Sequence, residues 1–175
     1  MKRLIILILI GICLFAETKD GIAFANNPQK TTPYYEDHSK RVGYKSVDEA
    51  VKEFEKYCNC VVKLPTMILD EQFTHEFGAV YKDKKNSENI QLQIRFVNRE
   101  MRNNILKIDI HTNPSDYEGN IYPLNNEQTG IYSEQNTFSV FVFEKNNLQY
   151  VVSIDKELTN LHSPQLLIDI ANSIE

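Results

Sequence analysis

The hydrophobic and polar positions of this chain follow two different periods, and each period predicts a class of element. Between Ser46 and Cys58 the apolar residues recur every three to four positions, which is the spacing of one helix face. Ser46 and Glu49 form a Ser-x-x-Glu capping box, which is typical of a helix start. We therefore predict a helix whose buried face consists of Val47, Ala50, Val51, Phe54 and Cys58.

Beyond this helix the period changes to strict alternation of apolar and polar residues. Such alternation is typical of strands that have one buried and one wet face. Residues 90–97 show it most clearly, and residues 105–111 repeat it after a polar connection. Shorter extended pieces are predicted at 61–64, 77–82, 121–124 and 130–133.

A hairpin is predicted from residues 138–144 and 148–154. Asn146 and Asn147 lie between the two segments, and asparagine tolerates the left-handed backbone that a two-residue turn requires. Both segments are apolar on both faces, which indicates central strands that are covered on both sides.

The chain ends in a second helical pattern over residues 164–174. Ser163 can cap this helix, and Pro164 suits the first helical position, where its missing N–H costs nothing. One helix before and one helix after a run of consecutive strands define the fold class. We predict an α+β fold, a mainly antiparallel β-meander sheet with one N-terminal and one C-terminal helix packed on it. It forms a single domain over residues 46–175.

The first 25 residues have the layout of a secretory signal peptide. Lys2 and Arg3 precede an apolar run over residues 4–16, and Ala23-Phe24-Ala25 supplies small residues for cleavage. The run is shorter than the ~20 residues that a membrane-spanning helix needs. We therefore expect a secreted or cell-envelope-associated protein, outside the cytoplasmic membrane, in which residues 26–45 form a flexible N-terminal arm.

Two alternatives remain for this segment. It could stay uncleaved as an anchor, which would be the protein's one contact with the membrane. It could also be lipidated at Cys13, although Ile12 is a poor fit to the small residue that usually precedes an acylated cysteine.

The charge of the chain excludes one class of partner. The formal net charge is −5, and removal of residues 1–25 would make it −6. Nucleic-acid binding needs a clustered basic surface, whereas the densest basic group here is Lys82 with Lys84 and Lys85. We expect no nucleic-acid partner and, since no nucleotide or metal motif is present, no cofactor and no metal.

Two cysteines, Cys58 and Cys60, remain once the signal is removed. In an extended segment, Cα atoms two residues apart lie at the limit of disulfide reach. We expect two half-buried thiols without an intramolecular bridge, and a redox-active bridge or an intermolecular bond remain the alternatives.

The four histidines lie on separate segments. The best local candidate for chemistry is Asp109-Ile110-His111, because alternation places the carboxylate and the imidazole on one strand face. The ordinary interpretation of the same pattern is a solvated polar face. A thiol route from Cys58 or Cys60 to His75 is disfavoured, since the cysteines follow a helix carboxyl end. We assign no catalytic residue.

Three stretches carry a resemblance to a known family, namely residues 61–66, residues 138–152 and the closing residues 166–174. They are similar to a domain of unknown function, number 4367 in that series, found in extracytoplasmic proteins and sigma-factor regulators of Gram-positive spore-forming bacteria. The chain departs from the pattern at residues 67–71 and in lacking tryptophan. The resemblance implies an extracytoplasmic location and a sensing or binding role, and it supplies no catalytic residues.

Two functional hypotheses follow. The first is a non-enzymatic domain that binds or senses a protein, a peptide or a cell-envelope component by its sheet face or a sheet edge. The second is a secreted enzyme with a dispersed site near Asp109 and His111. A lipid-binding carrier with an apolar cavity is a third possibility.

Overall fold

The computed structural model describes residues 40–69, 73–84, 89–101, 105–159 and 164–175. The chain divides into two compact units, residues 1–32 and residues 33–175, and all described residues belong to the second. The predicted signal peptide, Cys13, His38 and His162 lie outside the described residues.

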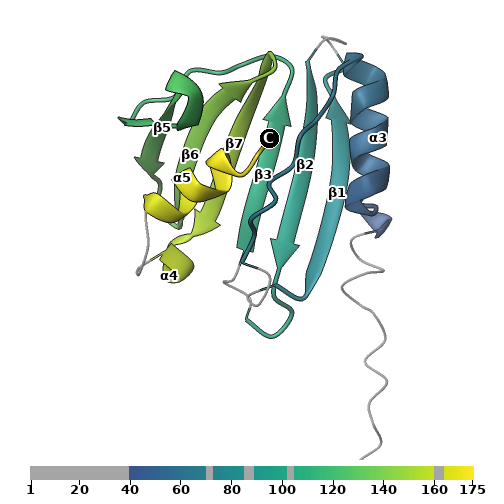
Figure 1. Cartoon of the computed structure of the whole chain (residues 1–175). Coiled ribbons are helices and arrows are strands. Elements are labelled where there is room, and N and C mark those ends of the chain that lie inside the picture. Colours follow the sequence, from purple (N-terminus) through teal and green to yellow (C-terminus); the bar gives the residue numbers. More distant parts are fainter. Residues whose placement is uncertain (1–39, 70–72, 85–88, 102–104, 160–163) are drawn as a thin grey trace, which may run out of the picture. The chain divides into compact units, whose positions relative to one another are not determined.

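Seven strands form one antiparallel sheet in the order β1-β2-β3-β7-β6-β5-β4 (Figure 1). Strands 90–97 and 105–111 occupy their predicted residues, and the other bounds shift by one or two positions. The strands are β1 His75–Lys82, β2 Ile90–Val97, β3 Ile105–His111, β4 Asn120–Pro123, β5 Thr129–Glu134, β6 Phe138–Lys145 and β7 Leu148–Asp155.

The predicted α+β fold is confirmed, and the sheet consists of two meanders. Strands β1 to β3 form the first and β4 to β7 the second. The two meanders join where β3 pairs with β7. At this junction Ile108 of β3 is paired with Ile94 of β2 on one side and with Val152 of β7 on the other. After β3 the chain therefore crosses to the far edge of the sheet before it returns strand by strand.

Helix α3 (Val47–Cys58) begins with the predicted capping box. The amide of Glu49 donates to the Ser46 hydroxyl, and the Glu49 carboxylate accepts from the Ser46 amide. The helix packs on β1 and β2 through Val47, Ala50 and Phe54. A Cβ on Gly78 of β1 would lie 2.5 Å from the Cβ of Ala50, so glycine permits this close approach.

Residues 61–69 form an extended strap, which includes the extended piece predicted at 61–64 and lies outside the seven-stranded sheet. Pro65 makes an isolated bridge with Ile174, and the Lys63 amide donates to the hydroxyl of Tyr150 at 3.3 Å. These contacts tie the strap to β7 and to the C-terminal segment. Proline and a short length explain why the strap does not join the sheet.

Two helices follow β7, the single-turn α4 (Lys156–Thr159) and α5 (Gln165–Asn172). Helix α5 begins one residue later than predicted, because Pro164 is its N-cap and not its first residue. Ser163, the predicted cap, lies outside the described residues. The main core lies between the sheet and α3, the strap and α5, with Phe54, Leu92, Ile94, Leu106, Ile108, Phe141, Tyr150, Val152, Leu167 and Ile170 fully buried.

The hairpin β6–β7 is covered on both sides, as predicted. On the side away from the helices, Val140, Val142 and Val151 form a second buried cluster, against which Tyr117 and Phe138 pack. The turn residues Asn146 and Asn147 both have positive φ, at 53° and 61°.

Residues 40–45, which the sequence placed in a flexible arm, are docked against β1. The amide of Lys45 donates to the Gly78 carbonyl at 2.8 Å, and the Gly78 amide donates back to Lys45 at 2.9 Å. The two bonds cover part of the otherwise free edge of β1, which is the physical reason that this segment is ordered. The arm up to residue 39 lies outside the described residues.

Candidate functional site

The sheet surface opposite α3 and α5 carries the polar side chains of the central strands, and we call it the open face. It is defined by Gln93 and Arg95 of β2 and by Lys107, Asp109 and His111 of β3. These residues alternate with buried core residues, as the sequence predicted. Their strands are neighbours, so one surface collects both signs of charge.

An ion pair lies at the centre of the open face. Nη1 of Arg95 is 2.7 Å from Oδ1 of Asp109, and the two side chains are only 16 % and 18 % exposed. Nη1 also donates a hydrogen bond to the carbonyl of Ile94 at 2.8 Å. Oδ1 is buried and accepts no well-directed hydrogen bond from the described residues, so the contact is one of charge.

Lys107 lies directly opposite Arg95 in the β2–β3 register, although like charges in such positions repel each other. Its Nζ is 3.5 Å from the centre of the Phe138 ring. Burial lowers the pKa of Lys107, and the charge of Arg95 lowers it further, while Asp109 and Asp155 raise it. The open face thus holds a partly desolvated ammonium beside the ion pair.

Two tyrosines approach the open face from segments outside the sheet. The hydroxyl of Tyr44 donates to Oε1 of Gln93 at 3.4 Å. Tyr117 belongs to the connection after β3, which Gln149 holds by two hydrogen bonds to the backbone of Ser115. Burial raises the pKa of both tyrosines. The charge of Asp109 raises that of Tyr117 further, whereas the charge of Arg95 opposes the rise at Tyr44.

The structure places the predicted pair Asp109 and His111 on one face but gives them separate surroundings. His111 lines an open hollow of about 390 Å³ to which Asp109 does not contribute. Burial lowers the pKa of His111, and the Asp109 charge raises it by less, so the imidazole is neutral at pH 7. The hollow is lined by Tyr81, Lys82, Asp83, Asn89, Gln91, His111, Asn113 and Ser115.

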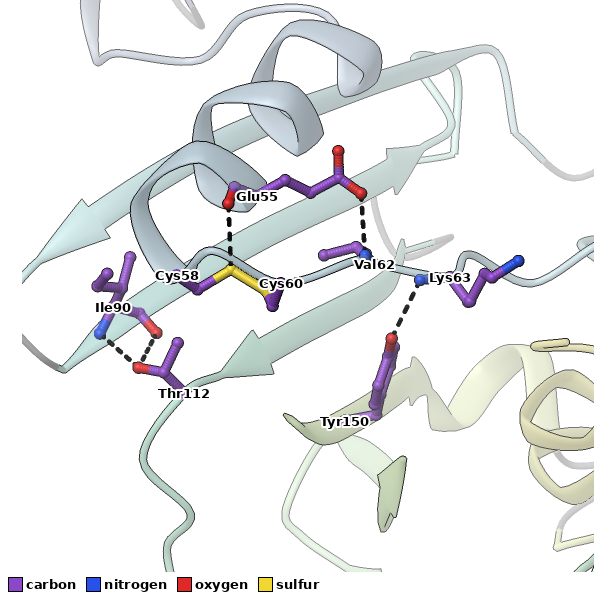
Figure 2. The surroundings of a disulfide bond; sticks show 8 residues. All are labelled: Glu55, Cys58, Cys60, Val62, Lys63, Ile90, Thr112 and Tyr150. Carbon is purple, nitrogen blue, oxygen red and sulfur yellow. Dashed lines mark hydrogen bonds between the residues drawn. A yellow bond between two sulfur atoms is a disulfide. The ribbon is translucent and has the colours of Figure 1, made fainter. Parts of the chain in front are cut away.

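The cysteines form an intramolecular disulfide, so the prediction of two free thiols is wrong (Figure 2). The prediction assumed an extended segment. Instead Asn59 caps α3 in the left-handed conformation, with φ 51° and ψ 44°. This brings the Cα atoms of Cys58 and Cys60 to 5.2 Å, well inside disulfide range.

His75 does not lie near the cysteines. Lys82, at the end of β1, has its Nζ 2.9 Å from the ring centre of Tyr57, near the end of α3. Gly78 lies against Ala50, nearer the start of the helix. Helix and strand therefore run in the same direction, and the cysteines lie at the opposite end from His75. The fold therefore does not bring His75 close enough to either cysteine to act as its base.

No group of three or more possible metal ligands occurs within the ranges that the structure describes. Sequence reasoning found Asp109 and His111 but missed Arg95, Lys107, Tyr44 and Tyr117. Arg95 and Lys107 could have been found, because each lies at a wet position of a strand that was predicted with its bounds. Nothing in the sequence indicates that the segments carrying the two tyrosines return to the open face.

Comparisons with family models, with curated proteins and with solved structures found no match. The resemblance to the domain of unknown function therefore stays a prediction. Among the described residues, no helix combines the length and the apolar character needed to cross a membrane.

Proposed function

We propose that this chain is a non-enzymatic binding or sensing domain that works outside the cytoplasmic membrane. Its partner is a protein, a peptide or a cell-envelope component, and the open face makes the contact. One observation carries the proposal: helices α3 and α5 and the strap pack on one side of the sheet, while Arg95, Lys107 and Asp109 gather on the other.

The chemistry of the open face favours binding over catalysis. A general base needs an oriented partner and a place for the reacting atom beside it. Asp109 is bound to Arg95 and does not line the hollow that contains His111. The carboxylate that the enzyme hypothesis paired with this imidazole is therefore engaged elsewhere.

The lipid-carrier hypothesis has less support still. A carrier needs an unfilled apolar interior, whereas the side chains between the sheet and the helices fill one another's space. Leu92, Ile94, Ile108, Val152 and Leu167 each have no exposed surface. Such close packing is that of an ordinary core.

The test is site-specific photocrosslinking in cells that naturally produce the chain. A photoreactive residue replaces Gln93 on the open face, and the matched control replaces Lys56, which is exposed on α3. The proposal expects a defined partner from position 93 and none from position 56. It also expects Lys107→Glu, which reverses one charge of the open face, to weaken binding of that purified partner by at least about ten-fold.

Equal capture from both positions, or unchanged affinity of a correctly folded Lys107→Glu chain, would contradict the proposal. Circular dichroism of each variant separates a lost contact from a lost fold.

A further inference from the structure

We propose that Cys58 and Cys60 are a redox-active pair that accepts two electrons from the dithiol of another protein. This activity is separate from binding at the open face and rests on different observations.

The bond does not join distant parts of the fold. Its two cysteines are two residues apart, and the stabilisation a disulfide brings grows with the length of the loop it closes. The end of α3 is already held without it. The amides of Asn59 and Cys60 both donate to the carbonyl of Glu55. A structural crosslink at this place would add little.

The backbone holds the two sulfurs near each other independently of the bond between them. Asn59 turns the chain back in the left-handed conformation. After Cys60, the amide of Val62 donates to Oε1 of Glu55 at 2.9 Å, which fixes the departing chain (Figure 2). Since none of these contacts needs the disulfide, a reduced pair would keep its geometry and could close again.

The reduced form would gain a contact that the disulfide cannot make. Sγ of Cys58 lies 3.7 Å from the carbonyl oxygen of Glu55, as Figure 2 shows. In the disulfide this sulfur carries no proton, whereas a thiol at the same place would be a weak donor that shares the carbonyl with the amides of Asn59 and Cys60. Stabilising the dithiol form of a pair makes its disulfide a better oxidant.

The pair lies at the surface, and an exposed residue precedes and follows it in the sequence. Tyr57, just before it, is 42 % exposed, and Val61, just after it, is 63 % exposed. Asn59 between the cysteines is exposed, and both cysteines are partly exposed. Exposed apolar groups beside a reactive bond suit contact with a peptide segment of a partner protein.

The exchange balances without a cofactor. A thiolate of the partner attacks one sulfur of the Cys58–Cys60 bond and forms a mixed disulfide. The other sulfur leaves as a thiolate and takes up a proton. The partner's second thiolate then attacks the mixed disulfide, which releases the remaining cysteine as a thiolate that takes up the second proton. The partner loses two electrons and two protons, and the pair gains both.

The experiment uses the purified oxidised chain and a reduced test peptide with two cysteines. We expect the chain to form the peptide disulfide about ten-fold faster than an equal concentration of glutathione disulfide. Mass spectrometry should show the chain gaining two hydrogens. The Cys58→Ser, Cys60→Ser double variant should form none, and the Cys60→Ser variant, which has one thiol and no bond to reduce, should form none either.

Thermal unfolding separates this role from a structural one. We expect the double serine variant and the reduced chain to melt within about 3 °C of the oxidised chain, since the bond closes a very short loop. A fall of about 10 °C or more would identify a structural crosslink and overturn the proposal. A bond that resists excess dithiothreitol in the folded chain would also overturn it.

Discussion

Single residues decide how closely the helix and the sheet of this domain approach each other. Glycine is generally unfavourable in a strand. Gly78 is nevertheless required in β1, because any side chain there would collide with Ala50 of α3. Its amide and carbonyl also bind Lys45. One position therefore serves both the packing of α3 and the docking of residues 40–45.

Gly78→Ala should lower the free energy of unfolding by about 1–3 kcal/mol, because the new methyl group would overpack the contact with α3. Urea denaturation measures this loss. Adding Ala50→Gly should return part of it, since the two methyl groups would otherwise share one space. A double variant whose losses simply add would show that the two positions do not interact.

His111 should make stability depend on pH. Burial lowers its pKa below the ordinary value of 6.5. The unfolded chain then binds this proton more readily than the folded chain. The resulting loss in the free energy of unfolding is absent above about pH 6.5. It grows as the pH falls from there toward the pKa of His111 in the folded state.

The free energy of unfolding should fall when the pH is lowered from about 7.5 to about 5.5. We expect this fall to be smaller in the His111→Gln variant than in the unmodified chain. Urea denaturation at both pH values gives the comparison. Equal losses in the two proteins would show that burial does not act on this imidazole.

Asp109 illustrates the limit of local prediction. Alternation correctly placed Asp109 and His111 on one face, because side chains two apart in a strand point the same way. The partner of Asp109, however, comes from the neighbouring strand. Which residue of β2 lies beside it depends on strand register, and the periodicity of one strand does not specify register.

Elements were predicted best where their signals are local. The capping box and the apolar spacing of α3 lie within one segment, as do the two asparagines of the β6–β7 turn. The extended piece at 61–64 was predicted, but no local signal indicated that it belongs to the strap and not to the sheet. Val62 and Leu64 of the strap pack on the main core, and the strap's partners Tyr150 and Ile174 are distant in sequence.

Tyr150→Phe should detach part of the strap. The hydroxyl of Tyr150 accepts the amide of Lys63, and phenylalanine would leave this amide without its acceptor. We expect a loss of about 1–2 kcal/mol in the free energy of unfolding. Hydrogen exchange should accelerate at the amide of Lys63. The amide of Val151, which follows Tyr150 in β7, should keep its protection. Unchanged exchange at Lys63 would contradict the role given to the hydroxyl.

The whole domain depends on the seam where its two meanders meet. Strands β3 and β7 pair over six positions, and Ile108 lies fully buried within that seam. The two meanders share one core, because a single buried cluster contains Leu92 and Ile94 of the first and Phe141 and Tyr150 of the second. The seam should therefore make the domain unfold as one unit.

Ile108→Ala should cost about 2–5 kcal/mol and weaken both meanders together. Hydrogen exchange at Leu92 and at Val142 reports on the two halves separately. We expect protection to fall by the same factor at both amides. A fall confined to the first meander would indicate two independent folding units.

Helices α3 and α5, the strands, the β6–β7 turn and the fold class follow from the sequence by itself, because each depends on neighbours within a few positions. The binding role outside the membrane remains a proposal. The tertiary structure decided the strand order, the pairing of Arg95 with Asp109, the strap and the Cys58–Cys60 bond. The first three need contacts between residues far apart in the chain. The bond depends on the backbone angles of Asn59, which residue spacing does not determine.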